Sequence, residues 1–158
     1  MSGTGSVPDI SSTVTIDQFL RTAGDDSGAA KNLYDRAVAY LSGHKWVSDV
    51  LYGYVGFLAP EVIGVFLLEI VPAEADVDRW LWVVVGDLPP AYVCSDNRTP
   101  FEALSAYLSE MQAWVDASVA GGSTEDLIPV NVAPNPENAG QLQTRLDFIR
   151  REFLPALS

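Results

Sequence analysis

The sequence predicts an α+β fold: an antiparallel sheet of three to four strands packed with three main helices, one before the strands and two after. Three observations lead to this prediction. Apolar residues recur at helical spacing towards both ends of the chain, β-branched and aromatic runs fill its middle, and the turns between those runs are short. Short connections leave no room for helical crossovers, so successive strands are expected to run antiparallel.

A single domain is expected at residues 13–158, after a flexible leader at residues 1–12 that is rich in Ser, Gly and Thr. Thr15-Ile16-Asp17-Gln18 has the spacing of a capping box, which predicts the start of a short helix. After a break at residues 24–28, the first main helix is expected at residues 29–42. Its apolar side chains fall on one face, and Gly43 follows as the C-terminal stop.

Strand signals follow at residues 46–56, 62–71 and 79–85, and the last of these is the clearest. It reads Trp80-Leu-Trp-Val-Val-Val85, so both of its alternating faces are apolar. This pattern is typical of a central strand that is covered on both sides. The segment at residues 91–94 is expected at an edge or in a wide loop, because prolines precede it and proline cannot donate to a ladder.

One nearly uncharged stretch, residues 51–70, is about as long as a membrane span. Pro60-Glu61 stands at its middle, and a carboxylate at mid-bilayer costs a few kcal/mol. The stretch is therefore interpreted as a buried strand pair, and no membrane partner is expected.

Two helices with strong start signals finish the chain. Thr99-Pro100-Phe101-Glu102 supplies a cap, a proline at the first helical position and a capping-box glutamate, and Gly121-Gly122 ends that helix. Asn135-Pro136 repeats the cap and proline before the last helix. The proline-bound segment at residues 126–134 is expected to be extended and to lie against the body of the domain.

The acidic charge is concentrated in the middle of the chain. The net charge is −12, and residues 46–144 carry fourteen acids against only Arg79 and Arg98, while the two ends cancel. Nucleic acid is not expected as a partner, because phosphate contacts need patches of Lys and Arg. The excess favours a basic protein partner, or it serves solubility alone.

The chain offers little for catalysis, and no catalytic residue, metal site or cofactor is predicted. His44 is the only histidine and follows a helix end, where it can interact with the last carbonyls. Cys94 is the only cysteine, at the end of an apolar strand, where a buried, inert thiol is usual. Its solitary thiol and the lack of a secretory signal in the first residues favour a cytoplasmic location.

The most function-like region is the hairpin around residues 80–92 and its exit, where aromatic residues stand beside a few polar groups. Pockets and interfaces are built in this way. The alternative interpretation makes the tryptophans core residues and the aspartates turn residues. The candidate binding residues are Trp80, Trp82, Asp87, Tyr92, Asp96 and Arg98.

The stretch from Trp80 to Tyr92, with Asp126-Leu-Ile-Pro-Val-Asn131 and Arg145-Leu-Asp-Phe-Ile149, resembles small bacterial proteins of unknown function. This resemblance implies no activity, so it transfers no site residue. In size, acidity and tryptophan content the chain is also similar to bacterial toxin-immunity proteins, a likeness of type that rests on no motif.

Three function hypotheses follow from these patterns. The favoured one is a non-enzymatic, acidic protein-binding module that masks a basic partner, as an immunity protein or antitoxin does. The second is a small-ligand-binding protein or hydrolytic enzyme with a pocket near the hairpin between Trp80 and Arg98. The third is a structural homo-oligomer joined through a helix stripe or an exposed sheet edge.

Overall fold

A computed structural model of the chain describes residues 10–96 and 98–157. Five strands form one antiparallel sheet in chain order: β1 (Val14–Thr15), β2 (Val47–Ala59), β3 (Ile63–Pro72), β4 (Trp80–Gly86) and β5 (Leu88–Cys94). The helices are α1 (Ile16–Thr22), the 3₁₀ turn η2 (Gly24–Asp26), α2 (Ser27–Ser42), α3 (Pro100–Ala120), α4 (Pro136–Glu152) and α5 (Leu154–Leu157).

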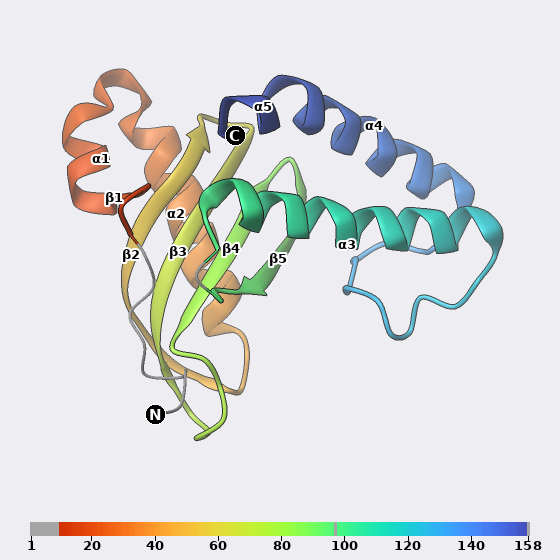
Figure 1. Cartoon of the computed structure of the whole chain (residues 1–158), viewed down its shortest axis with the longest axis horizontal. Coiled ribbons are helices and arrows are strands. Elements are labelled where there is room, and N and C mark those ends of the chain that lie inside the picture. The colour runs from red at the N-terminus through yellow and green to blue at the C-terminus, as the bar shows by residue number, and fades with distance from the viewer. Residues whose placement is uncertain (1–9, 97, 158) are drawn as a thin grey trace.

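The sheet is covered on both faces, by α2 on one side and by α3 and α4 on the other (Figure 1). Side chains of β4 alternate between the two resulting cores. Trp82 and Val84 join the cluster beneath α3 and α4, while Leu81 and Val83 join the cluster beneath α2. Every residue of β4 is buried, which confirms the prediction of a central strand covered on both sides.

The helix α3 begins and ends where the sequence predicts. The Thr99 hydroxyl accepts a hydrogen bond from the Glu102 amide at 3.1 Å, and the Glu102 carboxylate accepts one from the Thr99 amide at 2.9 Å. This reciprocal pair satisfies two backbone donors that the first helical turn leaves without partners. At the other end Gly121 adopts φ +74°, the left-handed conformation that glycine adopts without a Cβ clash.

A polar network fixes α4 against α3. The side-chain amides of Gln112 and Gln143 exchange hydrogen bonds of 2.6 and 3.1 Å across the two helices. Arg150 of α4 donates to the Gln112 side-chain oxygen at 2.8 Å. Because these contacts are directional, they set the register of the helix pair as well as its separation.

The pair of helices α3 and α4 projects past the β5 edge of the sheet, and the connection between them folds back beneath α3 (Figure 1). Leu127, Ile128 and Val130 of this connection are partly buried and pack against the core beneath α3. The connection therefore lies against the body of the domain, as its prolines and apolar residues predict.

The observed sheet corrects the predicted strand count, which is five rather than three to four. The additional strand, β1, pairs with Tyr54 and Val55 of β2. It was missed because two residues are too few to show alternation and because Thr15 also caps α1. The prolines preceding the last strand lie within β5, which is an edge strand as expected.

The helix prediction also needs correction. In the described chain α1 begins after Thr15, where a short helix was predicted, but η2 before α2 and α5 after α4 were not expected. The predicted break at residues 24–28 contains η2 and the start of α2, because a short turn of helix needs no apolar periodicity. Of the leader predicted at residues 1–12, residues 1–9 lie outside the described residues.

Residues 51–70 form most of the β2–β3 hairpin, with Pro60 and Glu61 in its turn, which confirms the predicted strand pair. Its burial is confirmed for β3 alone, because most of β2 is only partly buried. Within the described parts of the chain, no helix is long and apolar enough to cross a membrane.

We expect Gly86→Ala to destabilise the fold much more than Gly121→Ala. Both glycines have positive φ, but a Cβ at Gly86 would collide with the Val62 carbonyl, whereas a Cβ at Gly121 meets nothing within 4 Å. The expected losses are about 3 kcal/mol and about 1 kcal/mol of unfolding free energy, respectively. Urea denaturation followed by tryptophan fluorescence measures both. Equal losses would contradict the close approach of β4 to the β2–β3 turn.

Candidate functional site

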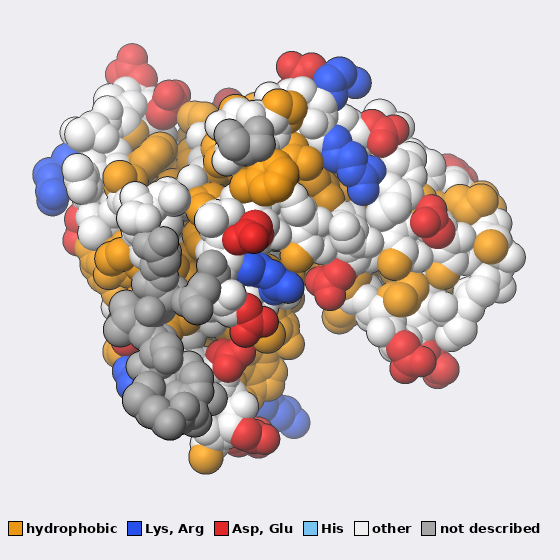
Figure 2. All heavy atoms as spheres, in the orientation of Figure 1, with side chains coloured by type: hydrophobic (Ala, Val, Ile, Leu, Met, Phe, Trp, Pro, Cys, Tyr) orange, Lys and Arg blue, Asp and Glu red, His pale blue; other side chains and the backbone are white. Residues whose placement is uncertain are grey.

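A concavity of about 820 Å³ opens beside the second half of β5. It lies between the C-terminal end of α2, the middle of α3 and the segment at residues 126–129. Figure 2 shows the molecule hollowed below the projecting helices, with acidic side chains on both sides of the hollow. The lining residues are Tyr40, His44, Tyr92, Val93, Cys94, Asp96, Arg98, Ala106, Ser109, Glu110, Asp126, Leu127, Ile128 and Pro129.

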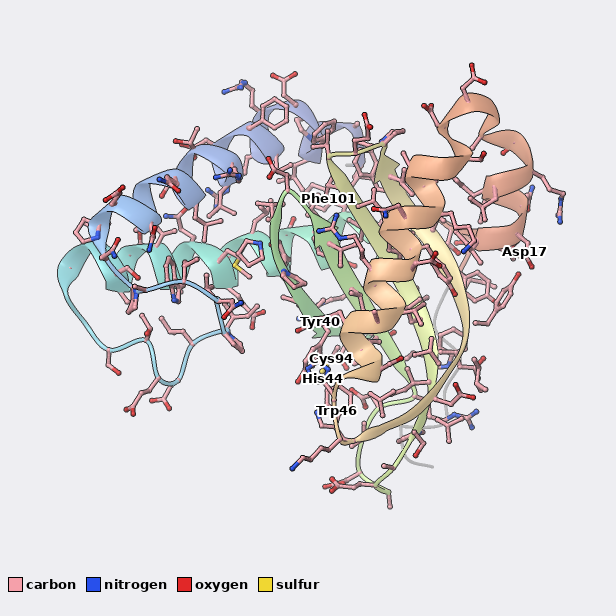
Figure 3. All side chains as sticks on the ribbon, turned by 180° about the vertical axis from the view of Figure 1, so that it is seen from behind. Asp17, Tyr40, His44, Trp46, Cys94 and Phe101 are labelled. Atoms are coloured by element: carbon pink, nitrogen blue, oxygen red, sulfur yellow. The ribbon has the colours of Figure 1, made fainter. Side chains whose placement is uncertain are left out.

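An aromatic cluster forms one wall of the concavity. The ring of His44 lies 5.0 Å from Tyr40, 4.9 Å from Trp46 and 5.5 Å from Tyr92, measured between ring centroids. Tyr40, His44 and Trp46 gather with Cys94 at the end of α2 (Figure 3). Several of the ring pairs meet edge to face, the arrangement that ring quadrupoles favour.

The position of His44 follows from the end of α2. Its Nδ1 lies 2.9 Å from the Tyr40 carbonyl, one of the last carbonyls of the helix, as the sequence predicts for a histidine after Gly43. A carbonyl accepts but cannot donate, so Nδ1 carries the proton and donates it. The other nitrogen, Nε2, is then a hydrogen-bond acceptor in the neutral ring.

Asp96 and Arg98 reach the concavity because the chain turns sharply after β5. Asp96 adopts φ +42°, a left-handed conformation that aspartate tolerates better than most residues. Arg98 then folds back, and its guanidinium donates to the Cys94 carbonyl at 2.9 Å. The end of the edge strand and the start of α3 are thereby held together.

The charges in the lining are predominantly negative. Asp96, Glu110 and Asp126 contribute carboxylates, against the guanidinium of Arg98. None of these three carboxylates forms an ion pair with any residue that the structure describes. The site therefore presents carboxylates that the fold itself does not neutralise.

The thiol and the phenols of the site stay neutral at physiological pH. Cys94 is exposed, not buried as the sequence predicts, because it stands at the end of an edge strand beside the concavity. Partial desolvation still raises the pKa of its thiol, and a hydrogen bond with Asp78 adds to the rise. Burial also raises the pKa of Tyr92, and it raises the pKa of Tyr40 to about 12. A thiol with a raised pKa is a poor nucleophile at neutral pH, because the thiolate is the reactive form.

The structure brings together three of the six predicted site residues. Tyr92, Asp96 and Arg98 line the concavity. Trp80 and Trp82 are buried in the core beneath α3 and α4, on the face of the sheet opposite to Tyr92, and neither lines the concavity. Asp87 lies at the other end of β5 and forms an ion pair of 3.3 Å with Arg145.

Sequence reasoning missed the residues that complete the site. Tyr40 comes from α2, His44 from the turn directly after it, Glu110 from α3 and Asp126 from the connection after α3, so they are far apart in the sequence. Only the fold makes them neighbours. The one signal available was the position of His44 and Trp46 directly after a helix end, where side chains project past the helix.

A smaller concavity, of about 350 Å³, lies beside the first half of β5. Its walls are the prolines of β5, the segment at residues 130–132 and one side of α4. Its lining is largely apolar, with the Asp87–Arg145 pair at its margin.

Within the described residues, no three His, Cys, Asp or Glu side chains are grouped so as to hold a metal ion. No family model, no curated protein and no solved structure matches the chain. The resemblance to small bacterial proteins therefore stays a prediction, and the function proposed below rests on the site itself.

We expect the Cys94 thiol to be alkylated with a pH midpoint above that of an ordinary thiol, because its pKa is raised. The rate with iodoacetamide, followed by mass spectrometry across pH 7 to 11, gives the midpoint. Asp78→Asn should lower the midpoint, since it removes a negative charge beside the thiol. A midpoint below the ordinary value would instead indicate an activated cysteine and would favour an enzyme.

We expect stability to fall as pH rises above about 10, partly through Tyr40. Its pKa is about 12 in the folded protein and about 10 when unfolded, so its stabilisation is complete below pH 10 and is lost on approaching pH 12. Because solvent screens this half-buried group, its contribution is about 1 kcal/mol. Urea unfolding of Tyr40→Phe should show a shallower alkaline decline than the parent protein. Parallel pH profiles would contradict the shift.

Proposed function

We propose that the protein is a non-enzymatic binding protein whose acidic concavity receives a basic segment of a partner protein and masks it, as immunity proteins and antitoxins do. The single observation that carries this proposal is the placement of three carboxylates without ion-pair partners, Asp96, Glu110 and Asp126, around an aromatic wall. We propose further that it acts in the cytoplasm, where its single thiol stays reduced.

Electrostatics favours a cation in this concavity. A lysine or arginine that enters meets several carboxylates at short range, where solvent screening is reduced. The aromatic wall adds to the attraction, because the faces of tyrosine and tryptophan rings attract cations. Tyr40 and Tyr92 supply such rings in the lining, and their phenols remain neutral donors.

The charge of the whole chain supports the same partner. A net charge of −12 produces a field that speeds the approach of a basic protein and disfavours nucleic acid. Residues far from the site thus contribute to the association rate, while the concavity supplies the contacts that hold the partner.

Catalysis receives less support from the same residues. His44 and Cys94 both line the concavity, but the thiol is protonated at neutral pH and lies beside Asp78, which disfavours the thiolate. A nucleophilic cysteine needs the opposite, an electropositive environment.

A small cationic ligand is the second candidate. The volume of about 820 Å³ is in the range of small-molecule pockets, and the aromatic wall suits a quaternary or primary ammonium group. A protein partner differs from such a ligand in the salt dependence of its association rate, because many charges contribute to it.

We expect a tagged, folded protein to capture a basic protein from a lysate of the source organism at about 50 mM salt, with weaker capture at about 500 mM. The triple variant Asp96→Asn, Glu110→Gln, Asp126→Asn should weaken this binding by about tenfold or more, through loss of the carboxylates around the concavity. Quantitative pull-down with the purified partner measures both effects.

The matched control is the triple variant Asp25→Asn, Asp26→Asn, Glu61→Gln. It removes the same number of charges from exposed positions outside the concavity. Its binding should stay close to that of the parent protein. Equal losses in both triple variants would show that net charge alone attracts the partner, and the absence of any basic partner would refute the masking function.

A further inference from the structure

The outer edge of β5 is open. β5 is the last strand of the sheet, and within the described chain no backbone hydrogen bond joins it to any element except β4. Among the described residues, side chains bond to its backbone at the two ends, where Tyr107 donates to the Pro89 carbonyl and Arg98 donates to the Cys94 carbonyl. An open edge of this kind can accept a further strand.

The two prolines of β5 limit the addition of a further strand to one half of β5. Pro89 and Pro90 have no N–H group, so an added strand would find too few donors there. Prolines on an edge are a common protection against unspecific pairing. The remaining half, Ala91 to Cys94, is the half that borders the acidic concavity.

Two concavities border the edge, one at each half of β5, and together they are called the groove. The larger concavity lies beside Tyr92 and Cys94, and the smaller one lies beside Leu88 and Pro89. One continuous segment, residues 126–132, forms the outer wall of both. This wall lies across from the edge without a backbone hydrogen bond to it, so the groove separates two stretches of main chain.

The two faces of β5 would contact alternate side chains of an added strand. Tyr92 and Cys94 face the α2 side, since their partners on β4, Val83 and Leu81, belong to the core beneath α2. Ala91 and Val93 belong to the core beneath α3. Cross-strand neighbours share a face, so an added strand would place every second side chain beside Tyr92 and Cys94.

We propose that the partner presents its basic segment as an extended strand, which pairs with Ala91–Cys94 along the open edge of β5. This inference rests on the proposed masking function and names the form of the bound segment. Its basic side chains alternate with apolar ones. The basic ones lie among the rings of Tyr92 and His44 and the nearby carboxylates, and the apolar ones lie against Leu127 and the underside of α3.

Charge complementarity is the reason for proposing a basic occupant, and the open edge is the reason for proposing that this occupant is a strand. A basic helix would satisfy the carboxylates but would leave the edge donors and acceptors of β5 without partners. A second copy of this chain would bring a second set of carboxylates into the groove, which is unfavourable at a net charge of −12.

The test uses an eight-residue peptide of alternating lysine and valine as the probe, with the whole protein. Cys94 lies in the concavity, so protection of its thiol from iodoacetamide reports occupancy at the site. Two isomers carry N-methyl groups, one on the lysine amides and the other on the valine amides. Alternate amides of a strand point to opposite edges, so only one isomer blocks the hydrogen bonds to β5.

We expect the parent peptide to slow Cys94 alkylation by about tenfold at saturation and one N-methylated isomer to bind about tenfold more weakly than the other. The control protein, Cys94→Ser with Val119→Cys, carries its thiol on an exposed part of α3 outside the concavity. Its alkylation rate should not change when the peptide is added.

Equal binding of both isomers at the site would overturn strand pairing and would leave the masking function standing. If no basic peptide binds or protects Cys94, both the strand and the masking function fail. If the protein alone forms a dimer in sedimentation experiments and its Cys94 is protected only in that dimer, a second copy covers the edge and the inference is overturned.

Discussion

The burial of the central strands on both faces is the constraint on which the rest of the structure depends. In β3 and β4 the apolar side chains point alternately to opposite sides, and nearly all of them are buried. A sheet that is apolar on both faces must be covered on both, and α2 alone covers only one. The other face needs a second layer, and α3 and α4 supply it after the last strand, held in register by Gln112 and Gln143.

The candidate site arises because the layer formed by α3 and α4 is longer than the sheet is wide. Five strands spaced about 4.8 Å apart span about 20 Å, whereas the 21 residues of α3 extend for about 30 Å. Since α3 lies across the strands, its second half has no sheet beneath it (Figure 1). The space beside β5, below the middle of α3 where the helix leaves the sheet, is closed only in part, by residues 126–132, and it becomes the groove beside β5. Its carboxylates and neutral phenols suit the recognition of a cation better than the activation of a nucleophile.

The sequence predicted what depends on local pattern and missed what depends on distant contacts. The caps at Thr99 and Asn135 and the doubly apolar strand β4 were predicted correctly because each has its signal within a few residues. The strand β1 was missed because it exists only through pairing with β2. For the site, Tyr92, Asp96 and Arg98 were grouped correctly because they follow one another at the end of β5. Trp80 and Trp82 were grouped with them by proximity in the sequence, but alternation along β4 buries both in the core beneath α3 and α4.

The most direct test of the central claim is a titration of the isotope-labelled protein with a basic peptide, followed by amide chemical shifts. If the groove beside β5 receives a basic segment, the shifts that change should cluster at residues 91–98 and 126–129 and at Glu110, with the Trp46 indole as a side-chain reporter. Amides of α1 and of the β2–β3 turn should keep their positions. Changes spread evenly over the acidic surface, or confined to residues 74–78, would contradict the claim, because they would mean that charge alone attracts the peptide and that the groove has no part in binding it.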